Sequence, residues 1–410
     1  MTAIAQSGKD PGIALRLLPI LGVVFVAFLV IGLALPVLPL YVHDHLGLSA
    51  FVVGLVTGSQ FAASLVARLW SGRTADRHGP KRAVVAGLVA AAAAGVLYLV
   101  STASLAMPEI SATVLLLGRA VLGGAESFII TGATAWGLAR AGTASAGKVI
   151  AWMGTAMFAA FAAGAPLGTM LYAHGGFAAV ALATVSIPLA TLALAVPLEA
   201  AAPAQKISPG LASVVRQIWL PGLAAALSSV GFGALITFSA LLFSTHGWEP
   251  VWLAFTAYAL ALIAARLLFG HLPDRHGGAK VALLCIIIEA VGLGLMGLAR
   301  STPIAVIGAA LTGLGYALVF PGFGVEAVRR TPPESRGVAM GAYTACLDLA
   351  LGIAGPGLGL IANAAGLGAV FLASAVVVAC AAPIALRLLA LTPPTSIAAH
   401  PSTAKTGKSP

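Results

Sequence analysis

The sequence predicts an all-α polytopic membrane protein with twelve transmembrane helices in two pseudo-symmetric six-helix bundles. Its composition is the first reason, because 60% of the 410 residues are hydrophobic and 8% are charged, whereas soluble domains carry about 25% charged residues. The mean hydropathy of +1.03 agrees with this. Length is the second reason, since roughly 30–35 residues per span and loop allow about twelve spans. The third reason is an internal repeat, described below.

The expected spans follow the apolar runs of the chain. They are 17–42, 50–70, 82–103, 112–138, 149–172, 177–198, 218–244, 251–269, 281–299, 304–327, 338–362 and 367–391. Residues 149–198 contain no Lys, Arg, Asp or Glu and are long enough for two helices. Because glycine interrupts helices readily, we expect this run to divide at His174-Gly175-Gly176.

The basic residues predict how the chain is oriented. Eighteen of the 22 Lys and Arg residues fall in segments on the N-terminal side of the membrane, Arg300 alone lies in a loop on the other side, and Arg68, Arg119 and Arg266 lie within spans. Cytoplasmic loops of membrane proteins are enriched in Lys and Arg. We therefore expect both termini to be cytoplasmic.

Polar segments divide the chain into five parts. We expect a cytoplasmic N-terminus at 1–16, an N-terminal bundle at 17–198, a cytoplasmic linker at 199–217, a C-terminal bundle at 218–391 and a disordered cytoplasmic tail at 392–410. The tail is rich in Pro, Ser and Thr, a composition that cannot form a packed core.

Two loop segments repeat each other at an offset of 198 residues. Residues 67–79 (ARLWSGRTADRHG) and 265–277 (ARLLFGHLPDRHG) share eight of thirteen positions. Each segment closes a span and opens the next loop, after the second and the eighth span. The repeat predicts two six-span halves in parallel orientation, an architecture of transporters with the substrate path between the halves.

The first repeated loop resembles the signature of the major facilitator superfamily, G-x-x-x-D-R-x-G-R-K-R. The resemblance covers the whole chain and implies a twelve-span transporter that works by alternating access. The loop charges and glycines are expected to latch the two halves together in the outward-open state, although the same residues could serve only to hold the orientation. The expected latch residues are Gly72, Asp76, Arg77, Gly79 and Arg82 in the first loop and Gly270, Asp274 and Arg275 in the second.

Shorter motifs resemble those of twelve-span drug–proton antiporters. Pro36-x-x-Pro39 in the first span and Arg119-x-x-x-Gly123 in the fourth are similar to elements of that group, whereas residues 164–169 (GAPLGT) match the antiporter element G-P-x-x-G-G only in part. The whole chain resembles bacterial efflux permeases of the YhhS type, which implies the bacterial inner membrane as its location.

Charged residues within spans are costly, by about 2.5–3.5 kcal/mol each on insertion scales, and so indicate functional sites. Arg119 and Glu126 lie seven residues apart in the fourth span, about 10 Å and nearly two turns, which places them on one helix face. Proton coupling requires a carboxylate that can be neutral or charged near pH 7. We expect Glu126, Arg119 and Asp348 to perform it; the alternative is static polar contacts between packed helices.

Other polar residues of the spans have simpler interpretations. We expect Glu289 to pair with a polar group of a neighbouring helix, and Glu326 to form an ion pair one turn along its own helix. Arg68 and Arg266 occupy matching places in the repeat and could reach the loop charges or the lipid headgroups.

A few residues of the matched motifs are candidates for the substrate cavity. These are Tyr41, Phe128, Pro36 and Pro39, for which ordinary packing is the alternative.

The expected function is proton-coupled efflux of a small solute or drug-like compound. The alternative is a proton-coupled importer of a sugar or other small metabolite; an organic anion is disfavoured because the second half offers only Arg266, near the inner end of its span. No nucleotide-binding loop or catalytic motif is present in the sequence, so we expect no enzyme activity, catalytic residue, cofactor or metal. The expected partners are the solute, protons and the lipid bilayer, and no nucleic acid. We expect the protein to be a monomer.

Overall fold

The computed structural model describes residues 11–142, 145–203, 211–332 and 335–391, and these ranges contain helices but no strands. The tail at 392–410, the first ten residues and residues 204–210 of the expected linker lie outside the described residues. The elements are α1 Pro11–Ala34, α2 Val37–Leu40, η1 Tyr41–His45, α3 Ala50–His78, α4 Pro80–Ala103, α5 Pro108–Ala141, α6 Ala146–Ala195, α7 Leu211–Thr245, α8 Leu253–Phe269, α9 Leu272–His276, α10 Gly278–Gly297, α11 Thr302–Arg329, α12 Arg336–Ala365, α13 Leu367–Ala379 and α14 Ala381–Leu391.

These helices supply the twelve expected spans. Ten apolar stretches of the described residues are long enough to cross a membrane, and α8 adds a shorter apolar helix of 17 residues. The 50-residue helix α6 counts as two spans, because Gly175 and Gly176 leave helical geometry in its middle. Gly176 has φ +62° and ψ −165°, a conformation open only to glycine. The division expected at His174-Gly175-Gly176 is therefore present.

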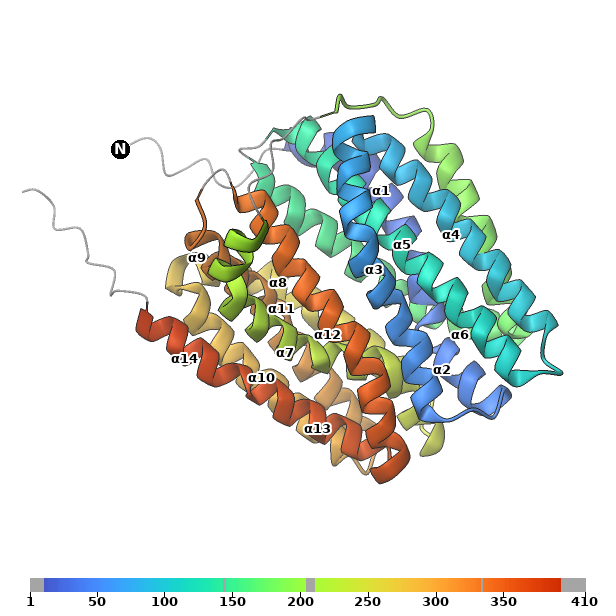
Figure 1. Cartoon of the computed structure of the whole chain (residues 1–410). Helices are drawn as coiled ribbons and strands as arrows, with labels where there is room; N and C mark the ends of the chain where they lie inside the picture. Colours follow the sequence, from blue (N-terminus) through green and yellow to red (C-terminus); the bar gives the residue numbers. More distant parts are fainter. Residues whose placement is uncertain (1–10, 143–144, 204–210, 333–334, 392–410) are drawn as a thin grey trace, which may run out of the picture.

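The helices form two groups that lie side by side (Figure 1). Helices α1–α6 occupy the right of the view and α7–α14 the left, and they meet where α3 packs along α12 and α6 packs against α8. This arrangement confirms the predicted all-α fold class.

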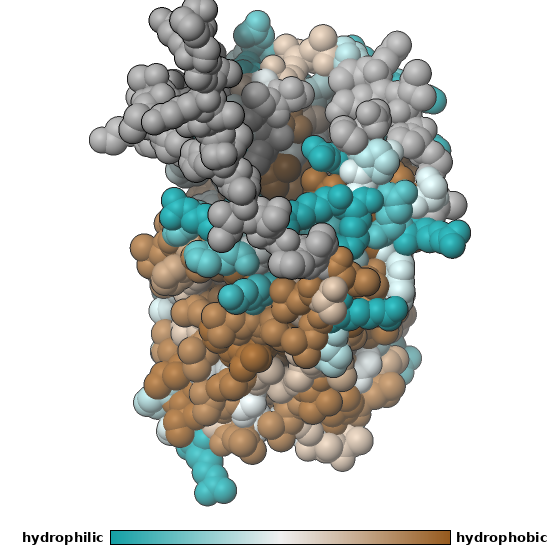
Figure 2. All heavy atoms as spheres, turned by 90° about the vertical axis from the view of Figure 1, so that its left-hand side faces the viewer, coloured by the Kyte–Doolittle hydropathy of each residue, from teal (hydrophilic) through white to brown (hydrophobic). Residues whose placement is uncertain are grey.

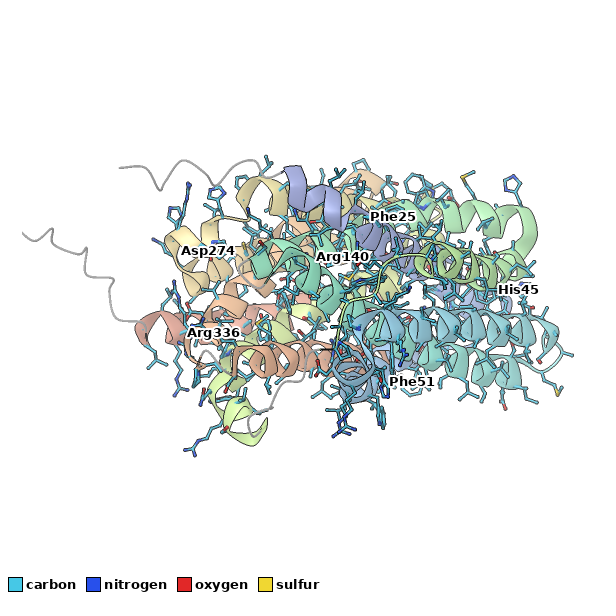
Figure 3. All side chains as sticks on the ribbon, turned by 90° about the horizontal axis from the view of Figure 1, so that it is seen from above. Phe25, His45, Phe51, Arg140, Asp274 and Arg336 are labelled. Atoms are coloured by element: carbon cyan, nitrogen blue, oxygen red, sulfur yellow. The ribbon has the colours of Figure 1, made fainter. Side chains whose placement is uncertain are left out.

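The two ends of the bundle carry different loops. We call the end that holds Gly79, Gly277 and Glu199 the linker side, and the end that holds Gly47 and Gly247 the opposite side. In Figure 3 the two ends separate clearly, because Asp274 and Arg336 lie towards the left and His45 lies at the far right.

The lateral surface is apolar, as contact with lipid requires. Figure 2 shows one such face, on which hydrophobic residues cover most of the lower part and hydrophilic ones gather in a band near the linker side. Large aliphatic side chains that soluble proteins bury are exposed on these helices, such as Leu267, Leu284 and Ile353, at 60–66%. An apolar surface of this extent is a membrane-facing surface.

The two copies of the repeat adopt the same turn. Gly79 has φ +96° and ψ +149°, and Gly277 has φ +92° and ψ +135°. Side chains are strained in this region of backbone space, which explains why both copies keep glycine there.

The two halves touch along α3 and α12 on the opposite side. The Cα of Gly54 faces the backbone of Gly355, and a Cβ at either position would overlap the other helix. Further along, the Ala50 amide donates a hydrogen bond to Asn363 Oδ1 at 3.1 Å. Towards the linker side the contact continues through Gly58 and Gly352, and then through the ion pair of Arg68 with Asp348.

Candidate functional site

A polar stripe runs along α3 inside an otherwise apolar helix. Gln60, Ser64 and Arg68 are spaced four residues apart, so they lie on one helix face. Gln60 and Ser64 are buried and Arg68 is half-buried. This face looks towards α5 in its own half and towards α12 in the other half, which makes α3 the centre of the candidate site.

An ion pair joins the two halves at this stripe. Arg68 Nε donates to Asp348 Oδ2 on α12 at 2.5 Å, and the Ser64 hydroxyl lies beside the same carboxylate. The side chains are 21% and 6% exposed, so water screens the pair little. The expectation that Arg68 reaches the loop charges or the headgroups is wrong, since a carboxylate 280 residues away holds it.

Glu126 meets the same stripe from α5. Gln60 Nε2 donates to Glu126 Oε2 at 2.6 Å. Arg68 and Asp348 are both close enough to interact electrostatically with the Glu126 carboxylate. Two of the three expected proton-coupling residues, Glu126 and Asp348, are thus gathered around Arg68 at the junction of the halves.

Arg119 is close enough to interact electrostatically with the Glu126 carboxylate, but among the described residues it makes no hydrogen bond or ion pair with this group. Its side chain is 1% exposed and lies next to Tyr98 of α4, and its Nε and Nη1 have no hydrogen-bond partner. Within the described residues it forms no ion pair with Glu126, although both belong to α5. Seven residues separate the two side chains by about 10 Å along α5, and in this conformation Glu126 accepts a hydrogen bond from Gln60 of α3 while Arg119 lies beside Tyr98 of α4.

The loop residues expected to form a latch are apart in this structure. Asp76, Arg77 and Arg82 are exposed, as are Asp274 and Arg275 of the second copy. None of them forms an ion pair with another described residue. An added Cβ at Gly72 would meet no atom within 4 Å, whereas Gly79 makes the turn between α3 and α4.

The expected cavity residues lie within the N-terminal half. Tyr41 is buried on the opposite side, where its ring stacks on Phe177 with 4.1 Å between centroids. Pro36 and Pro39 are also buried, at the junction of α1 and α2, and Phe128 is half-buried on α5. Tyr41 therefore packs against a neighbouring helix of its own half.

The second half repeats the geometry of the stripe with different side chains. At the offset of 198 residues, Gln60 corresponds to Tyr258 and Arg68 to Arg266. Gly123 of α5 packs against the backbone of Gln60, and Gly313 of α11 packs in the same way against Tyr258. Counting three residues onward from these glycines, Glu126 of the first half corresponds to Tyr316 of the second.

Aromatic rings surround this second site. Arg266 lies over the ring of Phe158 from the other half, 4.9 Å from its centroid, and its Nε donates to the Ala317 carbonyl at 3.2 Å. The ring of Phe232 of α7 lies 5.8 Å from the centroids of both Tyr258 and Tyr316, which are themselves 6.5 Å apart. We call Phe158, Phe161, Phe232, Phe255, Tyr258 and Tyr316 the aromatic cluster. Sequence reasoning missed it, because rings dispersed over four helices carry no local pattern.

The two remaining buried acids have local partners. Glu289 of α10 is fully buried and accepts a hydrogen bond from the Ser228 hydroxyl of α7 at 2.5 Å, as expected for a contact with a neighbouring helix. Glu326 pairs with Arg330 at 2.6 Å and with Arg329 at 3.8 Å along α11. The Glu289 contact joins α10 to α7, whereas the Glu326 pairs lie within α11.

Comparison with known proteins agrees with the repeat and the all-helical fold. The profile of the Major Facilitator Superfamily matches residues 20–255 and 247–409, and so covers nearly the whole chain. The chain belongs to the major facilitator superfamily. As a member of this superfamily it is a multi-pass membrane protein that transports small solutes and is not an enzyme.

Relatives within the superfamily are transporters too. The chain is 41% identical over 378 residues to the uncharacterized MFS-type transporter YhhS of Escherichia coli K12, covering 91% of this chain and 92% of the relative. Among solved structures it resembles the nucleoside transporter NupG, with a TM-score of 0.73 and 14% identity over 92% of this chain and 99% of that one. The D-xylose-proton symporter gives a TM-score of 0.73 at 15% identity, over 92% and 98%. These likenesses establish the fold and the transport class.

Proposed function

We propose that this facilitator exports a small, drug-like solute in exchange for protons, and that Glu126 is the residue that takes up and releases the proton. The observation that carries the proposal is the position of Glu126: a carboxylate within a span, hydrogen-bonded by Gln60, next to the ion pair that joins the two halves. Ionisable groups at such depth are costly and mark ion pathways.

The position of Arg68 suggests how a proton could drive the conformational change. Arg68 lies between two carboxylates, Asp348 of the other half and Glu126 of its own half. When Glu126 is neutral, Asp348 is the only carboxylate that attracts the Arg68 guanidinium, and the ion pair between the halves is strong. When Glu126 is ionised, it competes with Asp348 for Arg68 and weakens the ion pair between the halves. The charge on Glu126 thus biases the equilibrium between conformations, which is the requirement for coupling.

The conformation fits one stage of alternating access. With both termini in the cytoplasm, as the basic residues predict, the linker side faces the cytoplasm. An inward-facing stage fits, because α3 and α12 pack backbone against backbone on the opposite side, whereas Asp76 and Asp274 of the linker side are exposed. We propose that the loop charges around Asp76 and Asp274 meet when this side closes. The protein would act as a monomer in the bacterial inner membrane.

The test is substrate-linked proton movement in inverted vesicles, after toxic compounds have been screened against cells that lack or overproduce the protein. A compound that the cells resist is added, and the internal pH is followed by a fluorescent probe. Glu126→Gln is expected to abolish the pH change while the purified protein still elutes as a folded species. Glu109→Gln, an exposed acid at the start of the same helix, is the matched control and should behave as wild type.

Two results would count against the proposal. An unchanged pH response in Glu126→Gln would remove this residue from the coupling step. A pH change of the opposite sign would show symport and favour the importer of a sugar or other metabolite.

A further inference from the structure

Arg266 is a cation at the junction of the halves that lacks the partner its counterpart has. Arg68, the matching residue of the first half, pairs with Asp348 across the junction. Arg266 also reaches across the junction, because its Nη1 lies 3.0 Å from where a Cβ would stand at Gly154 of α6. Yet no acidic side chain of the described part of the chain forms an ion pair with it. Where α12 offers a carboxylate, α6 offers a glycine and the ring of Phe158.

The groups that do face Arg266 are aromatic and neutral. Tyr258 and Tyr316 are close enough to interact electrostatically with Arg266. Its guanidinium group lies over the ring of Phe158. The Tyr258 hydroxyl is fully buried and has no hydrogen-bond partner. The Arg266 guanidinium thus has a single backbone acceptor, the Ala317 carbonyl, and the Tyr258 hydroxyl beside it has none. Both groups can donate hydrogen bonds, so a bound anion would satisfy them.

Arg119 also lacks an ion pair, but it is sealed inside the first half at 1% exposure. Arg266 is half-buried and lies between the two halves, so a ligand can approach it. The rings around it offer a flat apolar surface, on which an aromatic body can stack. The ligand chemistry follows from both features together: a negative group for the guanidinium and an apolar body for the rings.

We propose that Arg266 and the aromatic cluster bind an organic monoanion with a flat apolar body, such as an aromatic carboxylate or sulfonate. In the second half the ligand's anion takes the place that Asp348 occupies in the first half. The proposal names the solute class for the export activity proposed above and rests on it. It reverses the expectation from sequence that disfavoured organic anions, because Arg266, although in the last turn of α8, is bordered by Phe158 and Gly154 of the other half.

The experiment uses the full-length protein in lipid nanodiscs and 1-naphthoate as the probe, with neutral 1-naphthamide of the same shape as the comparison. Binding is measured by titration calorimetry. We expect 1-naphthoate to bind more tightly than 1-naphthamide, and Arg266→Gln to weaken 1-naphthoate binding by about tenfold or more, the usual strength of a charge-assisted hydrogen bond. Binding of 1-naphthamide should change little. Arg300→Gln, an exposed arginine of a loop, is the matched control and should leave both affinities unchanged.

A second pair of variants separates binding from folding. Gly154→Asp places a carboxylate beside Arg266 and should abolish 1-naphthoate binding by internal competition, while Gly154→Ala adds only the Cβ and should retain most of it. The proposal is overturned if 1-naphthoate binds no better than 1-naphthamide, or if Arg266→Gln or Gly154→Asp binds it as wild type does. Failure of the export proposal would look different: 1-naphthoate would bind through Arg266, but its addition would move no protons in the vesicles.

Discussion

The two halves of this facilitator carry chemically different side chains at corresponding positions of the same backbone. In the first half, Gln60, Glu126 and Arg68 form a charged group that ends on Asp348 of the other half. In the second half the corresponding positions hold Tyr258, Tyr316 and Arg266, and the cation rests on an aromatic ring.

The difference shows that a duplicated fold can divide two tasks. The backbone is shared, as the glycine contacts Gly123–Gln60 and Gly313–Tyr258 demonstrate. Only side chains at these positions differ: one half carries groups that can exchange a proton, and the other carries groups that can hold an apolar ligand. Under the two proposals above, coupling belongs to the first of these sites and recognition to the second.

The largest expected effect comes from removing each arginine in turn. Arg68→Met leaves the Asp348 carboxylate, which is 6% exposed, without its cation. We expect this to destabilise the protein by about 3 kcal/mol, the usual cost of breaking a buried ion pair. Arg266→Met strands no charge and should cost about 1 kcal/mol or less, the strength of a cation–π contact. Thermal unfolding of the purified variants in detergent measures both.

The double variant Arg68→Met/Asp348→Leu is the control for this comparison. It removes both charges together and should recover most of the stability lost in Arg68→Met. Equal losses for Arg68→Met and Arg266→Met would contradict the contrast between a paired and an unpaired cation.

A smaller and symmetric effect is expected at the two loop glycines. Gly79→Ala and Gly277→Ala each force a side chain into the backbone region near φ +90° and should cost about 1–3 kcal/mol. Because the two turns have the same geometry, the two losses should agree closely. The same unfolding assay applies, and a loss at one loop only would show that the turns are not equivalent.

The smallest effect is expected at Tyr316, the counterpart of Glu126. Tyr316→Phe removes a hydroxyl that lies 3.3 Å from Ser229 Oγ, a long contact worth about 0.5 kcal/mol. Proton movement in vesicles should persist, in contrast to its loss in Glu126→Gln. Loss of the pH response in Tyr316→Phe would place proton transfer in both halves.

Much of the fold could be predicted from sequence, because lipid imposes long apolar helices and glycine breaks them. The division of α6 at Gly175 and Gly176 and the turn at Gly79 follow from single residues. The repeat at 67–79 and 265–277 also gave the two halves directly.

The site was predicted only in part, for a physical reason. Glu126 and Asp348 stand out because charges within spans are rare, but their partners depend on helix rotation. Arg68 binds Asp348 across 280 residues, and only the fold brings them together. One local signal was available: Gln60, Ser64 and Arg68 follow each other at four-residue spacing on α3, which marks a polar face.

The end of α6 is fastened to the first half by side chains from two other helices. Lys81 Nζ donates to the carbonyls of Val196 and Leu198 at 2.5 and 2.6 Å, and Trp136 Nε1 donates to the Glu199 carbonyl at 3.1 Å. The segment that joins the two halves is therefore held against the first half at least as far as Glu199. The twelve residues from there to Leu211 extend to about 40 Å at most. That length sets an upper limit on the distance between Glu199 and Leu211, so shortening the segment should restrict how far the two halves move apart on the linker side without changing either proposed site.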